Sequence, residues 1–170
     1  KFDKFDLNQK SSDSVARAIM TTDSFKKEIA FRVELENGKS FNLAAICKGA
    51  GMINPAFATM LCFILTDAAI PQSDMDELLK ETTKHSFDAV SVDGDTSTND
   101  TLMLLSSGKS GAYDKKAFKF ALDKITLEMA LNLVKDGEGS TKVVAFEVKG
   151  AASDDEASKA AKALSNSLLV

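Results

Sequence analysis

Two stretches of alternating apolar and polar residues predict a β-hairpin near the start of the chain. They cover residues 29–35 and 41–47, on either side of an Asn-Gly pair. A two-residue turn would place Val33 opposite Asn42, and apolar and polar side chains would then share one face of the sheet. A three-residue turn over 36–38 places Val33 opposite Phe41, and the two faces then agree. We therefore expect the three-residue turn, with Gly38 in the left-handed conformation.

Changes of hydrophobic period along the remaining chain predict a mixture of helices and strands. Helices are expected over 12–18, 73–84, 114–135 and 154–164, and further strands over 59–65, 87–92, 101–105 and 141–148. Strands and helices are interspersed and no internal repeat is present, so we expect an α/β fold, a layered helix–sheet sandwich of mixed strands and helices. In this fold the hairpin is followed by a glycine-rich loop and a buried strand.

The expected helix over 114–135 carries two apolar stripes. One stripe consists of Phe118, Leu122, Ile125 and Met129, and the other of Phe120, Leu127, Leu131 and Val134. A helix that is apolar on two sides is expected to be buried on two sides. Asp114 is a suitable N-cap for this helix, and Gly137 is its expected C-terminal stop.

Composition indicates a soluble globular protein and argues against several partners. The chain has 170 residues, of which 44% are hydrophobic and 27% charged, so it fits one domain with a substantial core. A net charge of -4 without a run of Lys or Arg argues against a nucleic-acid partner. The strongest apolar run, residues 60–65, is too short to span a membrane. Cys47 and Cys62 lie in apolar contexts and are expected to be reduced core residues of a cytoplasmic protein.

Familiar metal and triad motifs are incomplete in this chain. The oxygen-bearing residues of 93–99 have the spacing of a calcium loop, but Thr98 replaces the required glycine and Leu104 the required glutamate. His85 is the only histidine and falls near the end of a polar helix. We therefore expect neither a metal site nor a Ser-His-Asp triad.

A loop with two glycines and a proline, residues 48–55, leads into the strand expected from Thr59. The small residue Ala58 precedes Thr59, an arrangement suited to a chain that cuts its own backbone before a hydroxyl residue. Residues 48–61 resemble the self-cleavage site of the ornithine acetyltransferase (glutamate N-acetyltransferase) family, whose pattern reads Lys-Gly-small-Gly-Met-Ile-x-Pro-x-x-Ala-Thr-Met-Leu. Three further segments resemble the same family in the same order along the chain: Thr21-Thr22-Asp23, residues 92–101 and residues 136–142.

The resemblance implies that the bond between Ala58 and Thr59 is cut and that Thr59 then serves as the catalytic nucleophile. A threonine hydroxyl needs a base close by, and an N-terminal threonine carries one in its α-amine, whose pKa is roughly 7.7 to 8.0. Residues 1–58 would then be the end of an α chain and residues 59–170 the start of a β chain. The first residue, Lys1, is not an initiator methionine, so we expect a single fragment of a longer acetyltransferase.

The resemblance also implies which residues bind substrate, together with Thr59 itself. Lys48 matches a family lysine that contacts substrate, and a cation suits the carboxylate of an amino acid. Glu138 matches a family glutamate, and a carboxylate suits an amino group of ornithine or glutamate. Thr21 matches a substrate-contacting threonine, with Thr22 as the open alternative.

Other parts of the family's site are expected to lie outside this chain or to be structural. In the family a Thr-Gly pair supplies the oxyanion donors, and no such pair precedes residue 21. The family's further substrate-binding residues would lie beyond Val170. Within residues 93–101, we expect the Asp and Asn side chains to satisfy backbone groups of a tight loop.

The activity implied by the resemblance is transfer of an acetyl group from N-acetylornithine to Thr59 and then to glutamate, in arginine biosynthesis. Two half-reactions that share one acetyl-Thr59 intermediate make a ping-pong scheme. No metal or organic cofactor is implied, and acetyl-CoA stays open as a further donor. The cleaved halves are expected to pair as a heterotetramer of two α and two β chains. The alternatives are a related N-terminal-nucleophile hydrolase and an inactive α/β domain that binds an amino acid.

Overall fold

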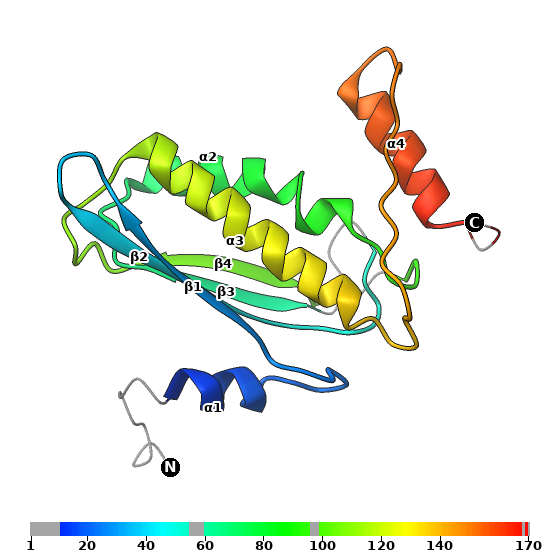
Figure 1. Cartoon of the computed structure of the whole chain (residues 1–170), viewed down its shortest axis with the longest axis horizontal. Coiled ribbons are helices and arrows are strands. Elements are labelled where there is room, and N and C mark those ends of the chain that lie inside the picture. Colours follow the sequence, from blue (N-terminus) through cyan, green and yellow to red (C-terminus); the bar gives the residue numbers. More distant parts are fainter. Residues whose placement is uncertain (1–10, 55–59, 96–98, 168, 170) are drawn as a thin grey trace.

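The protein folds around one four-stranded mixed sheet with helices packed on it (Figure 1). The computed structural model describes residues 11–54, 60–95, 99–167 and 169. The strands are β1 (Lys27–Glu34), β2 (Ser40–Lys48), β3 (Leu61–Thr66) and β4 (Thr101–Ser106), in the spatial order β1-β2-β3-β4. The pairs β1–β2 and β2–β3 are antiparallel, whereas β3–β4 is parallel. The layered α/β architecture expected from the sequence is confirmed.

The helices lie mainly on one face of this sheet. α2 (Gln72–Thr83) and α3 (Lys115–Lys135) pack side by side above the strands in Figure 1, while the short α1 (Ser11–Ala18) lies below them. α4 (Asp154–Ser165) follows a long extended segment and projects away from the sheet. All four helices are close to the ranges that the sequence predicts. Among the described residues, none of the helices has the length and apolar character needed to cross a membrane.

The hairpin between β1 and β2 has the expected three-residue turn. Val33 pairs with Phe41, and Phe31 pairs with Leu43. Gly38 is left-handed, with φ of +77°, and its N–H donates to the carbonyl of Leu35 at 2.9 Å. The register therefore follows from keeping apolar residues on one face, since a slip of one residue would reverse every side chain.

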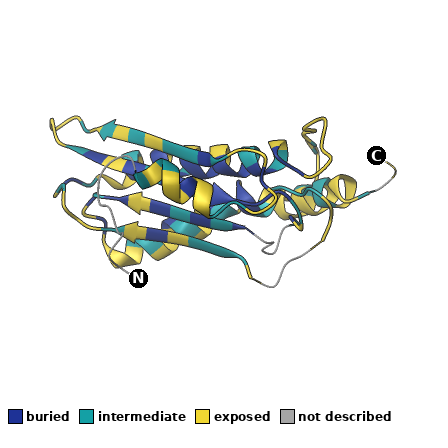
Figure 2. Ribbon diagram, turned by 90° about the horizontal axis from the view of Figure 1, so that it is seen from below, coloured by how far each residue is buried: buried dark blue, intermediate teal, exposed yellow. Residues whose placement is uncertain are grey.

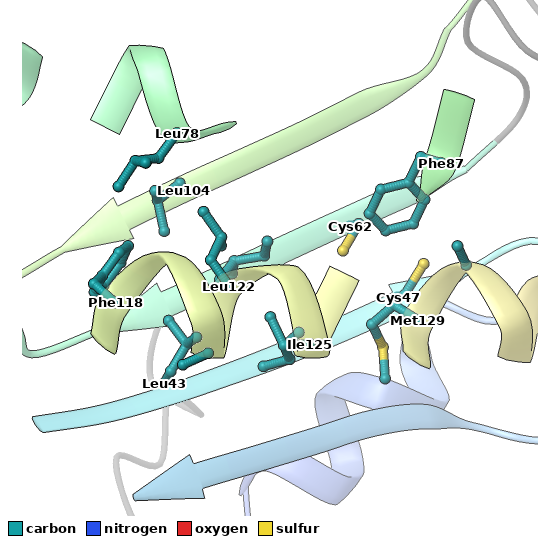
Figure 3. Packing of buried hydrophobic residues seen from close by; sticks show 14 of the residues in the cluster. Leu43, Cys47, Cys62, Leu78, Phe87, Leu104, Phe118, Leu122, Ile125 and Met129 are labelled. Carbon is teal, nitrogen blue, oxygen red and sulfur yellow. The ribbon is translucent and has the colours of Figure 1, made fainter. Parts of the chain in front are cut away.

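The core lies between α3 and the sheet (Figure 3). The first apolar stripe of α3, which comprises Phe118, Leu122, Ile125 and Met129, is fully buried there. It packs against strand residues that include Leu43 and Leu104. Cys47 and Cys62 are register partners on β2 and β3, and both are buried free thiols, as expected. The side chain of Asp114 accepts the N–H of Ala117 at 2.8 Å, which makes it the N-cap that the sequence predicts.

The prediction that α3 is buried on two sides is wrong for this chain. On its outer face, Phe120 is 66% exposed and Leu127 is 39% exposed. The sheet has a similar open face, because alternate side chains of β3 and β4 point away from α3. Leu65, Met103 and Leu105 on that face are all exposed, and Figure 2 shows the alternation of buried and exposed positions along the strands. No described element covers either surface.

Two of the expected strands are absent from the described structure. Residues 87–92 begin with a short 3-10 turn, η1 (Phe87–Ala89), because Phe87 is directed into the core. Residues 141–148 are extended but pair with no strand, and Val144 is exposed. Gly137 does follow the end of α3, yet it is not left-handed. A Cβ there would lie 2.8 Å from Val92, so close packing requires this glycine.

Candidate active site

The predicted site gathers around the loop that follows β2. The bond between Ala58 and Thr59 falls within residues 55–59, which lie outside the described residues, so the cleavage site and the nucleophile stay predictions. Residues 48–54 and Met60, on either side of that gap, are described. Their contacts define the described surroundings of that gap.

Lys48 and Thr21 are brought together by the fold. Lys48 is the last residue of β2 and is only 7% exposed. Its Nζ atom donates a hydrogen bond to Oγ1 of Thr21 at 3.2 Å. The structure shows this contact for Thr21 and none for Thr22, which favours Thr21 as the equivalent of the family's substrate threonine.

The environment of Lys48 differs sharply from that of the other buried lysine, Lys27. The Nζ atom of Lys27 lies 2.7 Å from a carboxylate oxygen of Asp23 and 2.5 Å from one of Asp136, and its side chain is fully buried. Lys48 has no carboxylate within ion-pair distance in the described part of the chain, and the only hydrogen bond of its Nζ atom there is to Thr21. A buried ammonium without an anion is costly. Lys48 is therefore suited to an anion that arrives with a ligand.

Glu138, which comes late in the sequence, contacts the same loop. It follows α3, and its N–H donates to the carbonyl of Ala50 at 2.8 Å. Its exposed carboxylate lies against Gly51, so that a Cβ on Gly51 would be 3.2 Å from Oε1. Gly51 thus leaves room for the carboxylate of Glu138. No hydrogen bond joins that carboxylate to Lys48 or Thr21 among the described residues.

Two aspartates of residues 93–101 hold the loop on either side of the predicted cleavage bond. The carboxylate of Asp93 accepts the N–H groups of Met52 and Ile53, the second at 3.0 Å. The Oδ1 atom of Asp100 accepts the N–H of Met60 at 2.8 Å. The expectation that this segment is structural is confirmed, and its target is the backbone of the cleavage segment itself.

Asp100 has a further property that the sequence did not reveal. Its second oxygen, Oδ2, is buried without a partner in the described part of the chain. Burial raises the pKa of Asp100 above its usual value, although the N–H of Met60 and the charge of Lys48 act in the opposite direction. A buried carboxylate with an unsatisfied oxygen is typical of a functional site, and this one is bonded to Met60, the residue that follows Thr59 in the sequence.

Asp23 is the residue that links Thr21 to the end of β2. Its Oδ1 atom accepts the N–H of Gly49 at 2.6 Å, and its Oδ2 atom accepts the N–H of Thr21 at 3.1 Å. Burial raises the pKa of Asp23, but bonds from Gly49, Lys27 and Thr21 outweigh it and hold the pKa below the usual value. The sequence placed Asp23 in a matching segment but gave no signal of these contacts, which depend on tertiary structure.

The described residues show no metal centre. No group of three or more His, Cys, Asp or Glu side chains within them has the geometry to hold a metal ion. His85 is exposed just after the end of α2.

Comparison with known proteins places the chain in a family. The chain belongs to the ArgJ family, whose model matches residues 3–170. It is 57% identical to the arginine biosynthesis bifunctional protein ArgJ of Wolinella succinogenes, over 96% of this chain and 41% of the relative. It is 48% identical to the glutamate N-acetyltransferase of Methanocaldococcus jannaschii, over 94% of this chain and 41% of the relative. The chain thus spans about two-fifths of the length of these curated relatives.

Proposed function

We propose that this chain is the central part of a self-cleaving glutamate N-acetyltransferase of the ornithine acetyltransferase type, acting in arginine biosynthesis. The observation that carries the proposal is the buried ammonium of Lys48, which is bonded to Thr21 beside the glycine-rich loop and has no ion pair with any described residue. Support also comes from relatives whose names include glutamate N-acetyltransferase and arginine biosynthesis. The substrates would be N-acetylornithine and glutamate, with acetyl-CoA open as a further acetyl donor.

The reaction begins with formation of the nucleophile. The hydroxyl of Thr59 attacks the carbonyl of Ala58, the C–N bond breaks as the nitrogen of Thr59 takes up a proton, and water hydrolyses the resulting ester. This step leaves a carboxylate on Ala58 and a free α-amine on Thr59. The α-amine then serves as the base for the hydroxyl of the same residue.

Acetyl transfer follows in two half-reactions. In the first, the hydroxyl of Thr59 attacks the acetyl carbonyl of N-acetylornithine, and its proton passes through the α-amine to the departing nitrogen of ornithine. The acetyl group is then an ester on Thr59. In the second, the amine of glutamate attacks that ester, and its proton returns to the oxygen of Thr59. No oxidant, metal or organic cofactor enters the balance.

The described residues provide charges for both ends of an amino-acid substrate. Lys48 binds the carboxylate, because it is a buried cation without an anion of its own in the described structure. The hydroxyl of Thr21 holds Lys48 and is within reach of the same group. Glu138 takes the amino group, since its carboxylate is exposed at the loop. Both substrates carry an α-carboxylate for Lys48. The free amino group is the δ-ammonium in N-acetylornithine, whose α nitrogen carries the acetyl group, and the α-amine in glutamate.

The remaining parts of the site are supplied by other segments of the polypeptide. The donors that stabilise the oxyanion and further substrate-binding residues belong to those segments. After the cut, residues 1–58 end the α chain and residues 59–170 begin the β chain. Two copies of each form the assembly.

The covalent intermediate tests the proposal directly. Full-length cleaved protein is incubated with N-acetylornithine in the absence of glutamate, and peptides are mapped by mass spectrometry. One acetyl group per site is expected on Thr59, and addition of glutamate should release it as N-acetylglutamate. The uncut Thr59→Ala variant is the control and should remain unlabelled. Turnover without acetyl on Thr59 would require direct transfer between bound substrates, and equally fast discharge by water would favour a hydrolase.

A further inference from the structure

Asp23 connects the two residues that the proposed function assigns to the substrate carboxylate. One of its oxygens binds the N–H of Gly49, the residue directly after Lys48, at 2.6 Å. The other binds the N–H of Thr21 itself at 3.1 Å. The side chain of Asp23 is fully buried. Its bond to Gly49 is also buried, whereas its bond to Thr21 is partly buried. One carboxylate therefore fixes the backbone on both sides of the Lys48–Thr21 contact.

An ion pair with Lys27 holds the carboxylate of Asp23 in place. Lys27 lies between Asp23 and Asp136, with all three side chains at most 1% exposed. Asp136, in turn, accepts bonds from the N–H and the hydroxyl of Ser24. The two carboxylates share one ammonium, so the cluster has a residual negative charge close to the end of β2. The pKa of Asp23 and that of Asp136 are both held below the usual value, so both carboxylates stay ionised at neutral pH.

The two carboxylates of this cluster differ in what they hold. Asp23 holds the backbone of Thr21 and Gly49, whereas Asp136 holds Ser24. Both share the ion pair with Lys27, so both contribute to stability in a similar way. Only Asp23 is tied to the residues around Lys48.

We propose that Asp23 is a positioning residue for substrate binding, which sets the distance between Lys48 and Thr21 through its two backbone hydrogen bonds. This inference rests on the proposed function, because it assumes that Lys48 and Thr21 bind the substrate carboxylate. Asp23 itself contacts no substrate. Its effect should appear in the affinity for amino-acid substrates more than in the chemical step.

The test compares Asp23→Asn with Asp136→Asn in the full-length enzyme. Each change removes one negative charge from the same cluster and weakens the same ion pair. KM for N-acetylornithine is expected to rise about tenfold in Asp23→Asn, the loss of roughly one charge-assisted hydrogen bond, with kcat reduced less than about threefold. In Asp136→Asn, KM should stay within about twofold of the wild type. Thermal unfolding of both variants is measured alongside, and comparable loss of stability is expected.

A third variant distinguishes a loss of substrate binding from a folding defect in Asp23→Asn. Asp23→Glu keeps the charge for Lys27 but lengthens the side chain by one methylene, which displaces the bonds to Thr21 and Gly49. It should fold normally and still raise KM. An unchanged KM in both Asp23 variants, or an equal rise in Asp136→Asn, would overturn the inference while leaving the proposed function intact. A wild-type enzyme without acetyl transfer would instead overturn the proposed function, and the inference with it.

Discussion

The Nζ atom of Lys48 donates to the Oγ1 atom of Thr21 at 3.2 Å, across 27 positions of sequence. Lys48 ends a central strand, whereas Thr21 lies in the turn before β1. Two of the residues named by resemblance thus meet, Lys48 buried and Thr21 exposed, and no carboxylate of the described chain lies within ion-pair distance of the cation. Lys48 is expected to act in substrate binding, whereas the neighbouring cluster of Lys27, Asp23 and Asp136 is expected to stabilise the fold.

Replacement of Lys48 by methionine should weaken catalysis. Loss of a charge-assisted bond to the substrate carboxylate costs roughly 1.5 to 3 kcal/mol, or about ten- to a hundredfold in kcat/KM. Steady-state kinetics of the full-length enzyme measure the effect. The exposed Lys149 offers a matched control, and Lys149→Met should behave like the wild type. Values for Lys48→Met within about twofold of the wild type would remove Lys48 from the site.

The two buried lysines should differ in their effects on stability. Lys27→Met leaves Asp23 and Asp136 buried without their cation, and should lower the free energy of unfolding by about 3 to 5 kcal/mol. Lys48→Met removes a buried charge that has no ion pair in the described structure, and should leave stability unchanged or higher. Urea unfolding of both variants at neutral pH measures the difference. Equal destabilisation would mean that Lys48 has an anionic partner.

Acid should destabilise the protein through Asp23 and Asp136. Because the pKa of each is lower in the folded than in the unfolded state, their stabilising effect is present above the unfolded pKa of about 3.9 and is lost as pH falls through the folded pKa. Unfolding followed by urea titration from pH 5 down to pH 2 should show this loss. Asp136→Asn should be less stable at neutral pH and lose less stability in acid. An identical pH dependence in that variant would contradict the assignment.

Gly51→Ala should affect activity through Glu138. Glu138→Gln should lower kcat/KM by about ten- to a hundredfold, because a charge-assisted bond to the substrate ammonium is lost. In Gly51→Ala the new methyl group would lie 3.2 Å from the Glu138 carboxylate and push it aside, so a loss in the same direction is expected. Gly38→Ala is the contrasting change. Gly38 is left-handed with open space around it, so the variant should lose about 1 kcal/mol of stability and no activity. Normal kinetics in both Gly51→Ala and Glu138→Gln would exclude Glu138 from substrate binding.

The sequence predicted those features that local pattern and register determine. The hairpin pairs Val33 with Phe41, because only that register keeps apolar side chains on one face. Residues 141–148 are also rich in apolar residues, but they pair with no strand in the described chain, and Val143 and Val144 are exposed. Alternation shows that a strand is favourable, and pairing depends on a partner that a single segment does not specify.

The site was predicted only in part for a similar reason. Lys48, Thr21 and Glu138 could be named by resemblance, and the fold brings all three to one loop. The supporting role of Asp23 was missed, and for Asp100 a backbone contact was expected but its partner, Met60, was not. Both side chains accept hydrogen bonds from backbone N–H groups that are distant in sequence. Because such a bond uses the main chain of the donor residue, the side-chain identity of that residue does not predict it.

The open outer faces of the sheet and of α3 have a practical consequence for handling this polypeptide. Large apolar side chains are exposed on both layers: Leu65, Met103 and Leu105 on the sheet, and Phe120 on α3. Surfaces of this kind associate with one another when nothing else covers them. The 170-residue chain produced by itself should therefore self-associate or precipitate, and co-expression with the rest of the polypeptide should keep it in solution.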